Sequence, residues 1–323
     1  MNLSWRLKTL IVLSLAISIM TACDLQFFYD PYAVLNNSAD WKQLRSQHFV
    51  YHYIEDESDI DYSRRIKRFD GTDYQCSPGD IEGAIGEYLA HFEQWYQRLA
   101  LLFGGDLSEH LPIHVYNYPS RQSQYELIGT YAAQSIEYAP MGSNEYRIHL
   151  GSEGVCAHEL IHLFQLLLGN APPLLSEGMA VALAGADWDG ALYSDLPTLH
   201  IGNEAAYQQP RWQGKPLHQQ AAQALAIKDF SIPIAYDPIP ALRPSDLIYW
   251  GSNLSRQWYL YCISGSFVHY LVETHGWTPF LEWYSTIDSS TLSTKDFHTA
   301  FYQSYGCSFL QAEEGYIAML EAL

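Results

Sequence analysis

Two histidines, His158 and His162, stand four residues apart, and Glu159 directly follows the first. On a helix, residues four apart differ by about 40° around the axis, so both imidazoles would project from one face and could share one metal ion. Glu159 would lie about 100° from His158, where its carboxylate can reach a metal-bound water without binding the metal. The pattern therefore predicts a metal centre at which Glu159 accepts a proton from water as that water attacks a carbonyl.

Glu177 is the candidate third ligand. It is the only acidic residue between His162 and Asp187, and it lies in an apolar segment behind the pair Pro172-Pro173. Two histidines and one glutamate form a zinc ligand set that leaves the fourth position for water. The alternative is a glutamate placed near the positive end of a helix dipole. Cys156 would point about 200° away from His158, so we interpret it as structural.

The elements that must position these residues can be read from apolar spacing and from caps. Helices are predicted over 80–103, 154–168, 174–184, 219–227 and 258–274, and strands over 48–53, 113–116 and 147–150. Residues 117–146 are rich in Tyr, Ser, Gln and Asn and are expected to cover or edge a cleft. The expected fold class is α+β. An N-terminal lobe with a mixed sheet (41–170) would pack on a mainly helical lobe (171–323), and the metal-binding helices would lie at the junction.

The chain resembles the gluzincin metallopeptidases, in particular the bacterial peptidase MA-like family. The resemblance rests on A-H-E-L-I-H-L-F-Q at 157–165 and L-S-E-G-M-A at 175–180, with weaker matches at 261–276 and 301–309. It implies a gluzincin-like fold in which His158, His162 and Glu177 bind Zn²⁺ and Glu159 is the general base.

Two positions depart from that family's pattern. Many gluzincins have a carboxylate four residues after the third ligand, where it supports the metal shell, and Val181 occupies that place here. No donor for a developing oxyanion can be assigned from spacing. Tyr261 is the preferred candidate, against the alternative of a core tyrosine, and His269 and Tyr270 are weaker candidates.

The remaining polar residues near the motif are less specific. Gln165 lies on the same stripe as the two ligand histidines and could face the site or serve packing. The other histidines are interpreted as surface or core residues rather than ligands of a second metal, namely His114, His149, His200 and His218.

Residues 1–22 have two basic residues followed by an apolar run, as a bacterial signal peptide does. The last three of these residues and Cys23 read Met-Thr-Ala-Cys, which is similar to a lipobox. Cys23 is therefore the predicted lipidation site, and plain secretion is the alternative. Residues 23–40 would form a tether. Asp24 is similar to a retention signal for the inner membrane, which suggests the periplasmic face of that membrane, although the outer membrane stays open.

Composition sets the class of protein and limits its partners. Charged residues make up only 16% of the chain and apolar residues 48%, which excludes disorder for most of it. The net charge of −19 makes nucleic acid an unsuitable partner. Pairing among Cys76, Cys156, Cys262 and Cys307 stays open.

Together these features predict a lipid-anchored zinc metallopeptidase of the bacterial cell envelope that cleaves peptides or proteins. The alternative is a weakly active or inactive relative that serves as a binding or assembly module.

Overall fold

The computed structural model describes residues 41–54, 65–67, 73–75, 80–129, 134–138, 145–151, 154–184, 211–212, 215–226, 243–248, 257–288 and 293–323. The predicted signal peptide and tether, with Cys23 and Asp24, lie outside these ranges, as do Cys76 and His200. Within them, no helix is both long enough and apolar enough to cross a bilayer.

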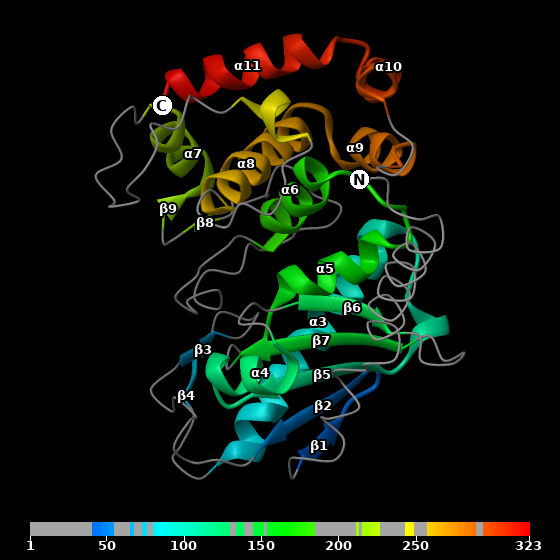
Figure 1. The fold of residues 1–323 in the computed structure, drawn as a ribbon, viewed down its shortest axis with the longest axis vertical. Coiled ribbons are helices and arrows are strands. Elements are labelled where there is room, and N and C mark those ends of the chain that lie inside the picture. The colour runs from blue at the N-terminus through cyan, green and yellow to red at the C-terminus, as the bar shows by residue number, and fades with distance from the viewer. Residues whose placement is uncertain are drawn as a thin grey trace, which may run out of the picture.

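A five-stranded mixed sheet forms the core of the N-terminal part, in the order β1-β2-β5-β7-β6 (Figure 1). The three central strands are parallel, and the two outer strands run antiparallel to their neighbours. The strands are β1 (Trp41–Arg45), β2 (Phe49–Ile54), β5 (Ile113–Tyr118), β6 (Gln134–Tyr138) and β7 (Glu145–Gly151). Two short hairpins lie elsewhere, β3 (Arg65–Lys67) with β4 (Asp73–Gln75), and β8 (Arg211–Trp212) with β9 (Lys215–Pro216).

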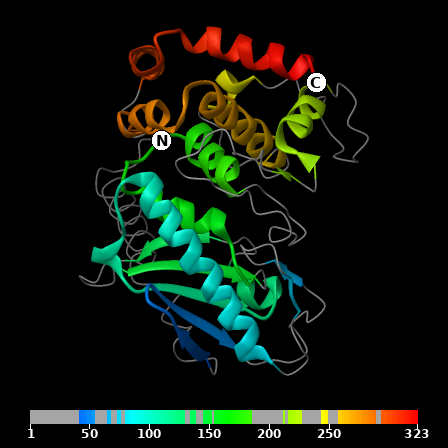
Figure 2. The ribbon, with the colours of Figure 1, turned by 180° about the vertical axis from the view of Figure 1, so that it is seen from behind.

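Helix α3 (Ile81–Phe103) crosses one face of this sheet, as the view from behind shows (Figure 2). The Asp80 carboxylate accepts a hydrogen bond from the Gly83 backbone N–H at 3.0 Å, which caps the first turn. Gly104, with φ of 65°, ends the helix in the left-handed conformation that glycine adopts without strain. The buried Phe92 of α3 packs against Phe49 of β2, so the helix and the sheet share one core.

Helix α5 (Ala157–Gln165), which carries the two histidines, lies between the sheet and α6 (Pro173–Ala184) (Figure 1). Helix α6 in turn packs closely on α8 (Gln257–His275), because two glycines let the backbones approach. A Cβ at Gly265 would lie 2.2 Å from Val181, and a Cβ at Gly178 would lie 2.8 Å from the Ser264 carbonyl oxygen.

Helices make up the rest of the described C-terminal part. They are α7 (Leu217–Ala226), α9 (Trp277–Ser285), α10 (Thr294–Tyr305) and α11 (Phe309–Glu321), with the 3-10 turn η3 (Pro244–Leu247). Trp283 of α9 makes edge contacts with Phe297 and Phe301 of α10, which ties these two helices to the core.

The observed architecture is mixed α/β at the N-terminal end and mainly helical beyond it. The predicted helices and strands are all present, with ends shifted by a few residues. The described part of residues 117–146, which the sequence predicted to cover or edge a cleft, contains α4 (Arg121–Ile128) and the edge strand β6. The sequence also gave no indication of β1, nor of the 3-10 turn η1 (Ser108–His110).

Candidate metal centre

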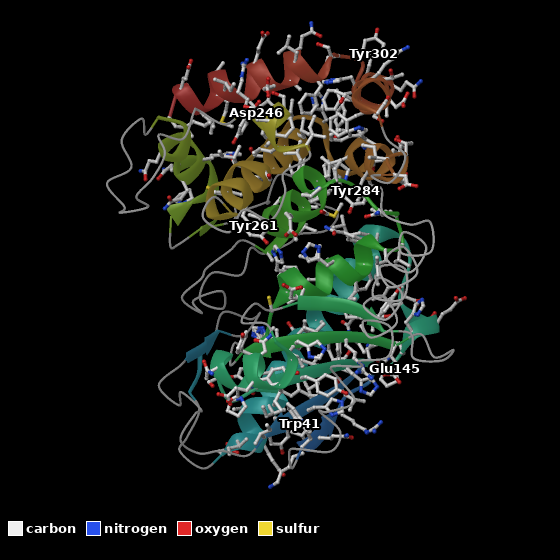
Figure 3. All side chains as sticks on the ribbon, in the orientation of Figure 1. Trp41, Glu145, Asp246, Tyr261, Tyr284 and Tyr302 are labelled. Atoms are coloured by element: carbon white, nitrogen blue, oxygen red, sulfur yellow. The ribbon has the colours of Figure 1, made fainter. Side chains whose placement is uncertain are left out.

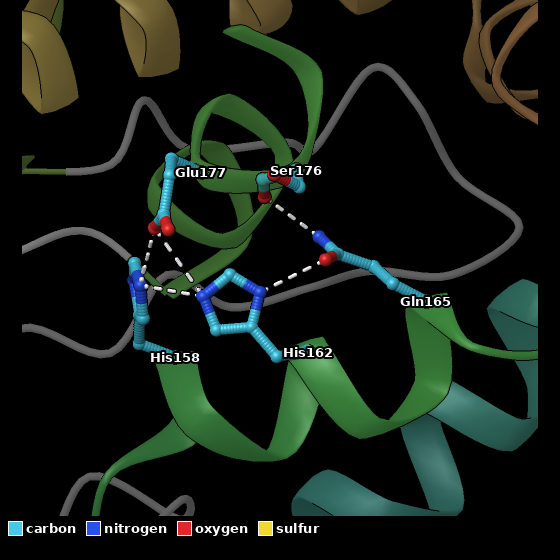
Figure 4. A network of polar contacts seen from close by, with 5 residues as sticks. All are labelled: His158, His162, Gln165, Ser176 and Glu177. Carbon is cyan, nitrogen blue, oxygen red and sulfur yellow. Dashed lines mark hydrogen bonds and ion pairs between the residues drawn. The ribbon is translucent and has the colours of Figure 1, made fainter. Parts of the chain in front are cut away.

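Helices α5 and α6 bring His158, His162 and Glu177 together (Figure 4). Glu177 Oε2 lies 3.1 Å from His158 Nε2 and 3.3 Å from His162 Nε2, and the two Nε2 atoms are 3.0 Å apart. The four-residue spacing places both imidazoles on one face of α5, as expected for a helix. The turn at Pro172 starts α6 so that Glu177 faces them.

These distances fit a shared metal ion. Three donor atoms placed about 2.1 Å from one tetrahedral ion lie roughly 3.4 Å from each other. The observed separations of 3.0–3.3 Å come close to that value. A carboxylate oxygen and two ring nitrogens this near to one another need a proton or a metal ion between them, because their lone pairs otherwise repel. The donor set therefore fits a cation site.

Gln165 fixes the orientation of His162. Its amide Nε2 donates a hydrogen bond to the Ser176 carbonyl oxygen at 2.7 Å, and its Oε1 lies 2.9 Å from His162 Nδ1 (Figure 4). A backbone carbonyl can only accept, so the amide oxygen must face the histidine and Nδ1 must carry a hydrogen. In the neutral imidazole this leaves the lone pair on Nε2, directed at Glu177 and His158.

Charge within the group is strongly coupled. Burial disfavours the charged form of His162, yet the hydrogen bond and negative charge of Glu177, aided by Glu159, raise the pKa of His162 to about 9. Burial also opposes ionisation of Glu177, but contacts with both histidines hold the pKa of Glu177 well below its usual range. The Glu177 carboxylate is thus ionised at neutral pH, and without a metal its charge is balanced by a proton on His162, beside the position where a metal would bind.

Glu159 and Tyr261 both lie near the group. Glu159 is 8% exposed, and its charge is close enough to His162 to raise the pKa of that imidazole. The Tyr261 ring makes an edge contact with His158, with centroids 5.9 Å apart. Figure 3 labels Tyr261 on α8, facing the junction of α5 and α6. The structure thus brings together all five residues that the sequence singled out, from three helices.

The two weaker candidates for the oxyanion donor lie elsewhere. Tyr270 faces α11, because its hydroxyl is 2.5 Å from the position of a Cβ at Gly315 and its ring packs on Tyr316. His269 contacts Glu273 on the same helix, two turns beyond Tyr261. Both therefore contact other parts of the helical region rather than the group of His158, His162 and Glu177.

Other sequence interpretations have plain structural outcomes. Val181 is fully buried against Gly265, so its side chain packs α6 onto α8. It does not orient a histidine of the candidate metal group, as Gln165 does. His114 pairs with His52, and His149 with Tyr118, on the sheet face opposite α3. No disulfide joins any two of the described cysteines, which are Cys156, Cys262 and Cys307.

Tyr284 is a neighbour of the group that the sequence did not reveal. It is buried at the end of α9, and the charge of Glu177, added to the effect of burial, raises the pKa of its hydroxyl. Nothing in its spacing links it to the histidine motif, since 107 residues separate it from Glu177.

Comparison with known proteins yields no relative: a scan against protein-family models and searches of curated proteins and of solved structures find no match.

Proposed function

We propose that this chain is a zinc-dependent peptidase of the bacterial cell envelope with a gluzincin-like arrangement of its metal helices. The observation that carries the proposal is the convergence of His158, His162 and Glu177 from two helices, with Glu159 beside them. A structural metal site does not require that extra glutamate, whereas hydrolysis needs a base next to the water.

Zinc is the metal that this donor set favours. Two imidazoles and one carboxylate match the His₂Glu sites of zinc hydrolases, in which one coordination position stays open. Bound zinc would polarise a substrate carbonyl and lower the pKa of a water molecule.

The side chains of the chain supply the remaining chemistry. Glu159, buried next to His162, is placed to accept a proton from water and to return it to the leaving amine. Tyr261, whose ring makes an edge contact with that of His158, is the proposed donor of a hydrogen bond to the oxyanion. Gln165 keeps the His162 ring oriented through its hydrogen bond with Nδ1.

A peptide is the substrate class that the nearby sheet edge favours. Strand β6 is the last strand of the five-stranded sheet and adjoins α5. An outer strand offers a row of backbone donors and acceptors to which an extended peptide can add as a further strand. A peptide held there would run past the metal helices. The envelope location rests on the sequence alone, on the predicted lipid anchor at Cys23.

One observation favours the alternative of an inactive binding module. Val181 stands where many gluzincins carry a carboxylate, and its burial against Gly265 leaves no room for one. The site then relies on Gln165 for support, which is compatible with metal binding without turnover.

A comparison of Glu159→Gln with wild type separates the two functions. We expect wild type to carry stoichiometric zinc at the His158 group and to cleave members of a peptide library. Glu159→Gln should retain that zinc and lose at least 100-fold in kcat/KM, since general base catalysis contributes about 10²–10⁴-fold. Equal inactivity of the two proteins would support the binding module, whereas equal cleavage by both would exclude Glu159 as the general base. Purified protein in which His158→Ala leaves the metal content unchanged would exclude the metal centre itself.

A further inference from the structure

A second cluster of metal-ligating side chains lies between α7 and α8, apart from the first. His218 Nε2 lies 3.0 Å from Glu273 Oε2, and His269 Nε2 lies 3.3 Å from Glu273 Oε1. The imidazole rings of His218 and His269 are 4.9 Å apart, and one donor atom from each of the three residues lies within 4.8 Å of the others. The donor set is again two imidazoles and one carboxylate.

The helices place these donors as they place the first set. His269 and Glu273 are four residues apart on α8, so they share one helix face. His218 comes from the first turn of α7. His269 is eight residues beyond Tyr261, which puts this cluster roughly 12 Å further along α8 at 1.5 Å per residue. The two clusters therefore have no ligand in common.

Ser266 and Glu273 contact the two ring nitrogens of His218. Ser266 Oγ lies 2.8 Å from Nδ1, and Glu273 Oε2 lies 3.0 Å from Nε2. An imidazole nitrogen and a carboxylate oxygen this close need a proton or a metal ion between them. The hydroxyl on the other side of the ring helps to orient Nε2 toward the carboxylate.

The cluster is buried on its imidazole side and open on its carboxylate side. His218 is 4% exposed and His269 is fully buried. The Glu273 side chain is 43% exposed, so the cluster reaches solvent on the carboxylate side and an ion has a path to it. Imidazoles that converge on one carboxylate in this way form a ligand set typical of divalent transition ions.

We propose that His218, His269 and Glu273 form a second metal site, which binds a divalent first-row transition ion such as Zn²⁺ and ties α7 to α8. A ligand set of imidazoles and a carboxylate favours such ions over Mg²⁺ or Ca²⁺, which take oxygen ligands. The site joins residues that are 51 positions apart in the chain, so its role is to hold the helical part together. It is independent of the proposed peptidase activity.

The test is a Co²⁺ titration of the metal-free full chain, followed by absorption spectroscopy and by metal analysis after dialysis. Wild type should bind two equivalents. Glu273→Gln should bind one, and because Glu273 is on the surface, this variant retains the buried packing of α8. Glu282→Gln on α9, also exposed and outside both clusters, is the matched control and should bind two. His218→Gln gives a second variant that loses the same equivalent.

Each result decides between the two sites. Loss of one equivalent in Glu273→Gln and of the other in His158→Ala supports both. A single equivalent in wild type that only His158→Ala removes would overturn the second site and leave the first. A single equivalent that only Glu273→Gln removes would support the second site and overturn the first. Two equivalents retained in both Glu273→Gln and His218→Gln would overturn the assignment of these ligands.

Discussion

Gln165 Oε1 accepts a hydrogen bond from His162 Nδ1 at 2.9 Å, which links a candidate metal ligand of α5 to the backbone of α6 through one side chain. The other end of the same amide donates to the Ser176 carbonyl, one residue before Glu177. Two of the three candidate ligands are thus held in register by a single residue. Metal-ligating histidines commonly have such a partner, and it orients the ring as well as setting its tautomer.

Replacement of Gln165 by Met should weaken metal binding. Met has similar volume but supplies neither an acceptor for His162 Nδ1 nor a donor for the Ser176 carbonyl, so the imidazole loses its fixed orientation. We expect the Kd for Zn²⁺ at this site to rise about 10–100-fold, the usual effect of removing such a partner. Competition with a chromophoric chelator measures the affinity. Gln124→Met on α4, an equally buried glutamine far from the metal group, is the control and should leave the affinity unchanged.

The close packing of α6 on α8 predicts that alanine substitution has opposite effects on stability at Gly265 and at Gly86. Gly265→Ala places a methyl group 2.2 Å from Val181, in a fully buried contact that can relax only if the helices separate. It should lower the free energy of unfolding by about 1–3 kcal/mol. Gly86→Ala in α3 has nothing within 4 Å of the new methyl group and should raise stability by about 0.5–1 kcal/mol. Urea unfolding of both variants checks this, and a stable Gly265→Ala protein would contradict the close packing.

Tyr261→Phe should separate catalysis from metal binding. The ring contact with His158 is preserved in phenylalanine, whereas the hydroxyl proposed to bind the oxyanion is lost. We expect zinc content to stay at the wild-type level and kcat to fall about 10²-fold or more, the cost of removing one oxyanion donor. Tyr302→Phe, at a 60% exposed position on α10, is the control. A wild-type kcat in Tyr261→Phe would assign the tyrosine to packing.

Local signals explain why the elements were predictable. Asp80 and Gly104 mark the two ends of α3, and both act as caps in the structure. The motif on α5 places His158 and His162 on one face whatever surrounds them. Strand β6 escaped prediction because its sequence, Gln134–Tyr138, is polar and owes its conformation to pairing with β7 rather than to its own pattern.

Longer-range contacts were beyond the reach of spacing. The sequence alone allows Gln165 either a site role or a packing role, because its partner, the Ser176 carbonyl, is a backbone atom on another helix. The sequence predicts His218 to be a surface or core residue rather than a metal ligand, because its contacts Ser266 and Glu273 are 48 and 55 residues away in the chain. Val181, which departs from the gluzincin pattern, is explained by its contact with Gly265 on another helix, and spacing in the sequence does not show that contact.

Buried histidines outside both clusters predict loss of stability in mild acid. Burial, with a smaller effect of Arg98 and against the attraction of Glu87, lowers the pKa of His91 to about 4. Burial and neighbouring cationic groups lower the pKa of His52 and of His149 to about 3. Between these values and about 6.5, the unfolded chain binds protons that the native protein does not. Stability therefore falls as pH falls through this window, by about 1.4 kcal/mol per pH unit for each histidine.

His91→Gln isolates one of these contributions. Because glutamine does not titrate, the slope of unfolding free energy against pH between about 6.5 and 5 should decrease by roughly 1.4 kcal/mol per unit, whatever the variant's stability at neutral pH. Urea unfolding at several pH values gives the slope. Leu89→Ala, on the same helix and also buried, reduces packing without changing the number of titratable groups, so its slope should match that of wild type. An unchanged slope in His91→Gln would mean that His91 is protonated in the native protein, at odds with the burial of its side chain, which is 2% exposed.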